Sequence, residues 1–109
     1  SSIFGKVSKE KRASYSASKF GLDGLTAAMS AELSQNNILV NSVGPGFIDT
    51  DMTRNILGNS GIRKVEQQIP IRRLGNVEEI ASFICWLASD LNTYLTGQNI
   101  MIDGGFTRV

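Results

Sequence analysis

Tyr15 and Lys19 are the residues of this chain whose types and spacing predict chemistry most directly. If residues 14–36 form a helix, a spacing of four places both side chains on one face, with Cβ atoms about 5–6 Å apart. A phenol is a poor base at neutral pH, but an ammonium beside it would stabilise the phenolate by roughly 3 kcal/mol at an effective dielectric of about 20. The pair therefore predicts a tyrosine that serves as a general acid and base.

Other catalytic machinery is excluded by composition. The chain contains no histidine, which rules out Ser-His-Asp and Cys-His catalysis and removes the commonest zinc ligand. Asp49 and Asp51 are spaced like two calcium ligands, but the glycine and the distal glutamate of a calcium loop are missing. We therefore predict no metal site.

Ser2 precedes Tyr15 by thirteen residues and completes a pattern that resembles the Ser…Tyr-x-x-x-Lys signature of the short-chain dehydrogenase/reductase family. Four further segments resemble motifs of that family, in the family's order and spacing: residues 41–52, 87–90, 94–98 and 103–105. The resemblance covers essentially the whole chain. It implies an enzyme dependent on NAD or NADP that interconverts a carbonyl and an alcohol.

The resemblance also implies a role for each residue of the signature. Ser2 would hydrogen-bond the substrate oxygen, and Tyr15 would give or take its proton. Lys19 would hold the nicotinamide ribose while stabilising the Tyr15 phenolate. The hydride would come from the cofactor.

The turn at residues 44–49 follows an apolar stretch and nearly matches the G-x-G-x-x-G dinucleotide fingerprint. Asp49 replaces the third glycine, and a proline removes an amide that could hold phosphate. The resemblance instead implies a turn against the nicotinamide ring, with the backbone near Ile48 and the Thr50 hydroxyl at the carboxamide. A simple strand-to-helix turn is the alternative. The expected cofactor-binding residues are Tyr15, Lys19, Pro45, Gly46, Ile48 and Thr50.

The composition is that of an ordinary globular domain, with 41% hydrophobic residues and a net charge of +1. No basic block suggests nucleic acid or a membrane surface, and we assign no function to the charged residues 6–13, which read as a solvated loop. No membrane span or signal peptide pattern is evident. Cys85 is the single cysteine; it suits a reducing cytosol and is expected to be a small core residue. We expect a cytoplasmic protein.

The helix that must position Tyr15 shows two stripes. One is expected to be core: Leu22, Leu25, Met29 and Leu33. The second consists of small residues that let another backbone approach: Ala17, Gly21, Gly24, Ala28 and Ala31. The resemblance implies that this helix packs at a subunit interface of a homo-oligomer, either a dimer or a tetramer. Packing within one subunit is the alternative.

Residues 38–43 and 99–103 are predicted strands, and Asn76 with Glu79 predicts a capping box at the start of a helix. Because helix separates the two strands, we expect parallel pairing with a crossover. Between them, residues 52–75 contain a glycine-bounded break and resemble the family's substrate lid. Arg72 occupies a position where the family often has glycine. The sequence does not decide whether Arg72 is a solvated surface charge or binds an acidic substrate or partner.

The family's glycine-rich phosphate loop, its selector for the adenosine ribose and an asparagine of its proton relay would all precede Ser2. The resemblance therefore implies an α/β fold, the C-terminal portion of a doubly wound, Rossmann-type parallel sheet with helices on both faces. Residues 1–109 would form the catalytic part of a single domain whose N-terminal cofactor-binding half is absent. The choice between NAD and NADP is left open.

Three functions compete. The motifs resemble those of 3-oxoacyl-acyl-carrier-protein reductases of fatty acid synthesis and of related sugar and hydroxysteroid dehydrogenases, implying a small carbonyl or alcohol substrate that could be carrier-bound. A serine acyl-enzyme is the second reading, because Ser16 and Lys19 satisfy S-x-x-K, but its companion motifs are missing. The third is a truncated, catalytically silent fragment that retains only the oligomerisation surfaces.

Overall fold

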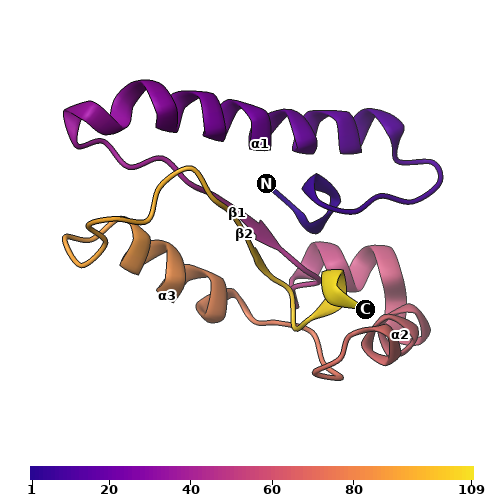
Figure 1. Ribbon diagram of the computed structural model, residues 1–109. Helices are drawn as coiled ribbons and strands as arrows, with labels where there is room; N and C mark the ends of the chain where they lie inside the picture. The colour runs from indigo at the N-terminus through magenta and orange to yellow at the C-terminus, as the bar shows by residue number, and fades with distance from the viewer.

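The chain forms three α-helices, two short strands and three 3-10 turns, and the computed structural model describes all of residues 1–109. The two strands lie between α1 on one side and α3 on the other, while α2 lies beyond one end of the strands (Figure 1). The predicted arrangement of helices on both faces of a sheet is therefore present in this chain.

The helix α1 (Ala13–Leu33) carries the Tyr15 signature and continues into the 3-10 turn η2 (Ser34–Asn36). It ends at Asn37, whose φ of 59° is left-handed, a conformation that asparagine tolerates well. The predicted helix over residues 14–36 is confirmed. Its buried side chains are small and polar: Ser16, Thr26 and Ser30.

The leucine stripe of α1 is not core within this chain, contrary to expectation. Leu22, Leu25 and Met29 expose 37%, 54% and 37% of their surface. The helix instead packs through its small polar side, where the Ser30 and Thr96 hydroxyls lie 2.9 Å apart. Because these side chains are short, the helix approaches closely and the leucines are left on the outside. The small-residue stripe is also exposed.

The strands β1 (Ser42–Pro45) and β2 (Asn99–Ile102) pair in parallel, with Ser42 opposite Asn99. The expected parallel crossover is confirmed, but the first strand begins later than predicted. Residues 38–41 bond to a loop instead, since the Val40 N–H donates to the Thr96 hydroxyl at 2.9 Å. The Val40 carbonyl accepts the Gly97 N–H at 2.7 Å, so both backbone groups of this residue are paired without extending the sheet.

The helix α3 (Val77–Leu87) begins with the predicted capping box. The Glu79 N–H donates to the Asn76 side chain, and the Asn76 N–H donates to the Glu79 carboxylate, both at 2.9 Å. Cys85 is exposed on this helix, so its predicted core position is wrong. At about 100° per residue, it lies roughly 140° around the helix from the half-buried Ile80.

The core of the chain is small. Eight of 109 residues are buried, and Ile3 and Ile69 are the hydrophobic ones among them. Large apolar side chains of α3, including Ile84 and Trp86, expose 47% and 39% of their surface. Much of the apolar surface of the helices is therefore without a partner within these residues. None of the helices has the length and apolarity that crossing a membrane requires.

Candidate active site

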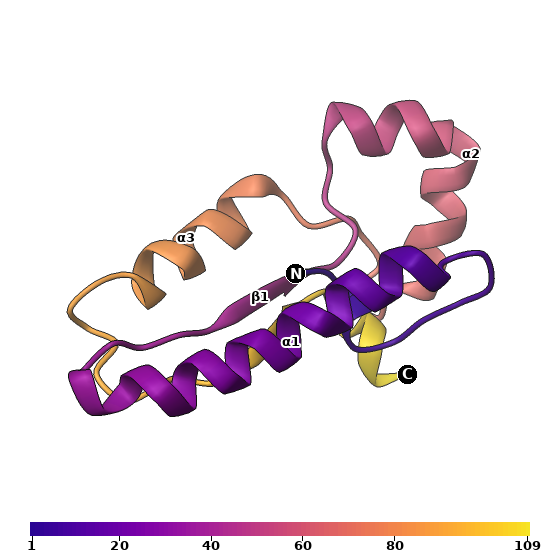
Figure 2. The ribbon, with the colours of Figure 1, turned by 90° about the horizontal axis from the view of Figure 1, so that it is seen from above.

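The candidate residues lie at the carboxyl ends of the two parallel strands. Residues 46–50 follow β1 directly, and Asp103 follows β2. Figure 2 shows that the beginning of α1 and the helix α2 (Asp51–Gln68) lie toward this same end of the molecule. In open parallel sheets, ligands bind beyond the carboxyl ends of the strands.

Tyr15 and Lys19 meet on one face of α1, as their spacing of four predicts. The Lys19 Nζ lies 5.3 Å from the centroid of the Tyr15 ring. Tyr15 is 42% exposed, and Lys19 is half-buried. Both ion pairs of the chain involve other residues, so the Lys19 charge has no carboxylate partner.

Ser2 is the N-cap of the 3-10 turn η1 (Ile3–Gly5). Its hydroxyl accepts the Phe4 N–H at 3.3 Å, which caps the turn. The Phe4 ring then meets the Tyr15 ring edge to face, with centroids 6.0 Å apart and an interplanar angle of 77°. Phe4 thus connects Ser2 to Tyr15. The Ser…Tyr-x-x-x-Lys pattern does not include Phe4, whose one signal in the sequence is an aromatic residue two positions after Ser2.

Two glycines allow the turn η1 to pack between α1 and β1. A Cβ on Gly5 would lie 3.0 Å from the Lys19 carbonyl oxygen, and one on Gly44 would lie 3.0 Å from the Ser2 carbonyl oxygen. Contacts this close are tighter than side chains normally tolerate. The turn that carries Ser2 therefore lies directly against α1 near Lys19 and against β1 at Gly44.

Ile48 presents unpaired backbone groups in the turn after β1. The residues on either side of Ile48 bond to Gly75 instead. The Gly75 N–H donates to the Phe47 carbonyl at 2.9 Å, and the Asp49 N–H donates to the Gly75 carbonyl at 2.8 Å. In such a parallel bridge, the N–H and C=O of Ile48 point away from the segment that contains Gly75. The Ile48 N–H and C=O have no hydrogen-bond partner in the chain, and together they offer one donor and one acceptor.

Pro45, Gly46 and Thr50 have identifiable structural roles in this turn. Pro45 ends β1, and the Gly46 N–H donates to Ile102 at 2.9 Å. A Cβ on Gly46 would lie 2.7 Å from the Asp103 Cα, so only glycine fits. Thr50 is the N-cap of α2, and its hydroxyl oxygen accepts the Thr53 N–H at 3.2 Å.

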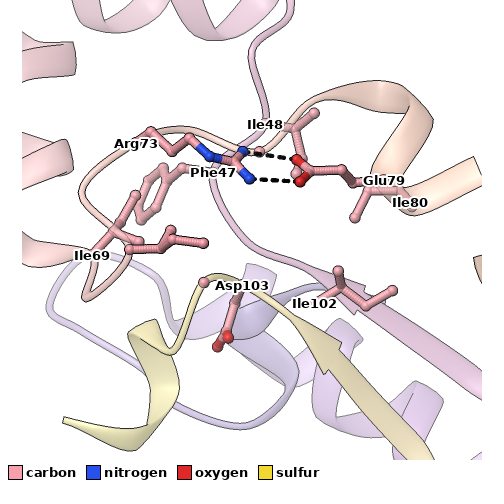
Figure 3. Close-up of a pocket in the computed structure, with 11 residues that line it drawn as sticks. Phe47, Ile48, Ile69, Arg73, Glu79, Ile80, Ile102 and Asp103 are labelled. Carbon is pink, nitrogen blue, oxygen red and sulfur yellow. Dashed lines mark hydrogen bonds and ion pairs between the residues drawn. The ribbon is translucent and has the colours of Figure 1, made fainter.

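A cavity of about 220 Å³ lies behind the turn, between β2, the start of α3 and the loop after α2. Figure 3 shows the Arg73 guanidinium bonded to both oxygens of Glu79 beside it. This ion pair and the Asn76 N–H lower the pKa of Glu79 to about 2. The apolar side chains that line the cavity are Phe47, Ile48, Ile69, Ile71, Ile80 and Ile102. The ion pair ties the loop after α2 to the first turn of α3.

The expected lid segment, residues 52–75, consists of a kinked helix and that loop. α2 is interrupted at Gly58, whose φ of 63° and ψ of 176° are not helical, so the predicted break between two pieces is present. Met52 and Ile56 expose 70% and 73% of their surface on its first piece. The Arg72 side chain donates to the Gln67 carbonyl and closes the end of α2, which accounts for this arginine without an acidic partner.

Ser16 is poorly placed for the acyl-enzyme reading. It exposes 7% of its surface, and its hydroxyl lies 2.6 Å from the Ser8 hydroxyl. A nucleophile has to reach its substrate, and a base has to contact it. The alternative based on S-x-x-K therefore has no structural support.

A family model described as enoyl-(acyl carrier protein) reductase matches residues 1–107. The chain is 42% identical over 105 residues to the 3-oxoacyl-acyl-carrier-protein reductase FabG of Aquifex aeolicus, covering 96% of this chain and 42% of that protein. It is 43% identical over 104 residues to FabG of Pseudomonas aeruginosa, covering 95% and 42%. The chain thus spans less than half the length of these relatives.

Solved structures agree. The fold is similar to that of 4-hydroxyisoleucine dehydrogenase complexed with NADH, with a TM-score of 0.93, 35% identity, and coverage of 100% of this chain and 45% of that one. It is also similar to YwfH, an NADPH-dependent reductase involved in bacilysin biosynthesis, with a TM-score of 0.91, 30% identity, and coverage of 97% and 44%. The predicted α/β class, a Rossmann-type parallel sheet, is confirmed.

Proposed function

Because this chain belongs to the short-chain dehydrogenase/reductase family, we propose that the protein containing it is an NAD- or NADP-dependent oxidoreductase that interconverts a carbonyl and an alcohol. The observation that supports the proposal is the packing of η1, the turn capped by Ser2, against Tyr15 through the Phe4 ring, with the Lys19 ammonium 5.3 Å from the Tyr15 ring. Residues 1–109 would be the C-terminal catalytic part of a single Rossmann-type domain. Residues 52–75 would be its substrate lid.

Tyr15 is the proposed proton donor and acceptor. No hydrogen bond within the chain occupies its hydroxyl, and 42% of the residue is exposed, so a substrate oxygen has access to it. Ser2 would donate its hydroxyl proton to the same substrate oxygen while it accepts the Phe4 N–H. Lys19, with its charge 5.3 Å from the ring, would offset the charge left on the Tyr15 oxygen after proton transfer.

The residues present fit a nicotinamide. A carboxamide has one carbonyl and one NH₂, which match the free N–H and C=O of Ile48. The Thr50 hydroxyl accepts the Thr53 N–H and lies 3.1 Å from the Thr53 hydroxyl; with Thr53 as the donor of that pair, Thr50 would have its own proton for a ligand. The Lys19 ammonium would hold the ribose hydroxyls. Pro45 and Gly46 would shape the turn against the ring. The cofactor would supply the hydride.

A 3-oxoacyl thioester, with its acyl chain bound to an acyl carrier protein, is the proposed substrate. The relatives named as 3-oxoacyl-acyl-carrier-protein reductases support this class. The exposed apolar side chains of Met52 and Ile56 on the lid helix suit contact with an alkyl chain. A homo-oligomer, either a dimer or a tetramer, is part of the proposal. The exposed stripes of α1 and the exposed Trp86 support it.

The test is a hydride-transfer assay on a purified protein that contains residues 1–109. NADH and NADPH are each supplied with a 3-oxoacyl thioester and, separately, with a small hydroxyketone. We expect consumption of one nicotinamide with the thioester and formation of the 3-hydroxyacyl product. A protein that reduces only the small ketone would refute the acyl substrate. A protein that oxidises neither NADH nor NADPH, whichever carbonyl compound is supplied, would refute the proposed reaction.

A silent fragment is the second candidate, for the 109-residue chain alone. Ile3 and Ile69 are its only buried hydrophobic residues, and a glycine-rich phosphate loop is not recognisable in its sequence. Calorimetry on the purified chain, with its mass confirmed and no companion present, should detect no binding of NADH or NADPH. Micromolar binding would show that these residues suffice to hold the cofactor.

A further inference from the structure

The loop between η1 and α1 concentrates positive charge beside the candidate active site. It carries a net charge of +3, whereas the whole chain carries +1. These charged side chains are exposed, and neither ion pair of the chain includes one of them. The excess is therefore local and not neutralised. The loop, residues 6–12 and hereafter the basic loop, has the following charged residues: Lys6, Lys9, Glu10, Lys11 and Arg12.

The basic loop is anchored at both ends. At its C-terminal end, the Arg12 carbonyl accepts the Ser16 N–H of α1 at 2.7 Å. The Val7 N–H donates to the Ile3 carbonyl at 3.0 Å, and the Ser8 hydroxyl lies 2.6 Å from that of the buried Ser16. Lys11 has a left-handed φ of 60° just before α1 begins. Figure 1 shows the loop as the indigo segment that extends past the start of α1 and turns back into it. Its charges are therefore held at a defined place.

Two of these charged side chains contact Phe4, whose ring also contacts Tyr15. The Lys9 Nζ and the Arg12 Cζ lie 5.7 and 5.6 Å from the centroid of the Phe4 ring, and that same ring meets Tyr15 edge to face. A ring face attracts a cation and orients it without cancelling its charge. The cations therefore remain available to a group that approaches Tyr15 from solvent.

We propose that the basic loop binds an anionic group on the thiol arm of the substrate, a phosphate or a carboxylate, while the carbonyl of the acyl group lies at Tyr15. This proposal rests on the proposed function and adds a specificity determinant to it. Unpaired cations at the rim of a site attract an anionic ligand and raise its association rate, an effect that salt screens. Charged thioesters would then be preferred over neutral ones.

The test compares one 3-oxoacyl group on three carriers: a neutral N-acetylcysteamine thioester, a coenzyme A thioester with its phosphates, and an acidic acyl carrier protein. Lys9→Gln/Lys11→Gln removes two positive charges. Lys6→Gln/Lys11→Gln removes the same charge but leaves both cations on Phe4, which separates loss of charge from loss of packing. The two charged carriers distinguish a small phosphate from carboxylates of a protein.

The matched control, Thr93→Glu/Tyr94→Glu, makes the same change in net charge on exposed side chains. These residues follow α3, at the opposite end of the strands from the basic loop (Figure 1). Thermal midpoints of all variants report folding. The Michaelis constant for the nicotinamide shows whether the loop acts on the cofactor instead.

At low salt we expect both loop variants to lose about tenfold in kcat/KM with at least one charged carrier. The loss should shrink at high salt, and the control should lose less than about twofold. Equal losses with the neutral and the charged thioesters would overturn the proposal, as would no loss with either charged carrier. Wild-type protein that reduces the neutral thioester supports the proposed function separately. A wild-type protein that reduces none of the three thioesters would reject both the role of the basic loop and the proposed function.

Discussion

The Lys19 ammonium lies 5.3 Å from the centre of the Tyr15 ring, and both side chains belong to the first two turns of α1. Their proximity follows from helical spacing alone. It needs no contribution from the rest of the fold. What the fold adds is η1, the turn capped by Ser2, which packs the Phe4 ring against Tyr15.

Lys19→Met should weaken nicotinamide binding by roughly 10- to 100-fold, the usual effect of losing a charge-assisted hydrogen bond. The ammonium has no carboxylate partner within the chain, so its loss leaves no unpaired carboxylate behind. Titration calorimetry on a purified protein that contains the chain measures the affinity. Lys64→Met, at an exposed position of α2, is the control. Equal affinities for the two variants would remove Lys19 from the cofactor site.

Gly46→Ala should destabilise the protein by about 1–3 kcal/mol, because an added methyl group would overlap the backbone of the next strand. Its Cβ would lie 2.7 Å from the Asp103 Cα. Gly21→Ala is the contrast, since no atom lies within 4 Å of its Cβ and alanine favours a helix. Urea denaturation compares the two. An unchanged midpoint for Gly46→Ala would mean that the two strands separate easily at this point.

Gly24→Leu should shift the protein toward smaller assemblies. A Cβ on Gly24 meets nothing within 4 Å in this chain, so the stripe of small residues is open to a partner helix. A leucine there would hold that partner away. Light scattering reports the mass. A variant of unchanged mass would place this face inside one subunit.

Glu79→Gln should lower stability at neutral pH and have no effect in strong acid. The Arg73 guanidinium lowers the pKa of Glu79 from 4.5 to about 2, and glutamine preserves the capping-box geometry while removing the charge. Because the folded-state pKa is depressed, this stabilisation is complete above pH 4.5 and is lost as the pH falls through about 2. Denaturant midpoints across this range check the trend. A difference in midpoint between variant and wild type that stays constant across this pH range would show that the ion pair is not the source of the stabilisation.

Much of the fold follows from local sequence. The Asn76–Glu79 capping box, the helix of Tyr15 and the parallel pairing of the strands were all predicted, because each depends on residues close in sequence or on the rule that parallel strands need a crossover. The first strand was placed too early. Residues 38–41 have strand-like side chains, but they bond to Thr96, which no local pattern indicates.

The site was harder to predict where it depends on packing between distant elements. The free backbone groups of Ile48 result from its bridge to Gly75, 27 positions later. Phe4 contacts Tyr15 of α1 and the Lys9 and Arg12 cations of the basic loop, and these contacts form only when the loop and α1 pack around its ring. Burial was also predicted wrongly for α1. Its leucines have the spacing of a core face, but this chain covers the neighbouring polar face of the helix, with Ser16, Thr26 and Ser30.

The central claim is that Tyr15 transfers the proton, and Tyr15→Phe tests it most directly. The variant should retain the Phe4 contact and nicotinamide binding while losing the hydroxyl alone. Tyr94→Phe is a matched control, because Tyr94 is the only other tyrosine and is 95% exposed. Rates of carbonyl reduction are measured at saturating nicotinamide, whose affinity is checked separately. We predict a loss of roughly 10²–10⁴ in kcat for Tyr15→Phe and none for Tyr94→Phe. A Tyr15→Phe protein with wild-type turnover would contradict the proposed mechanism.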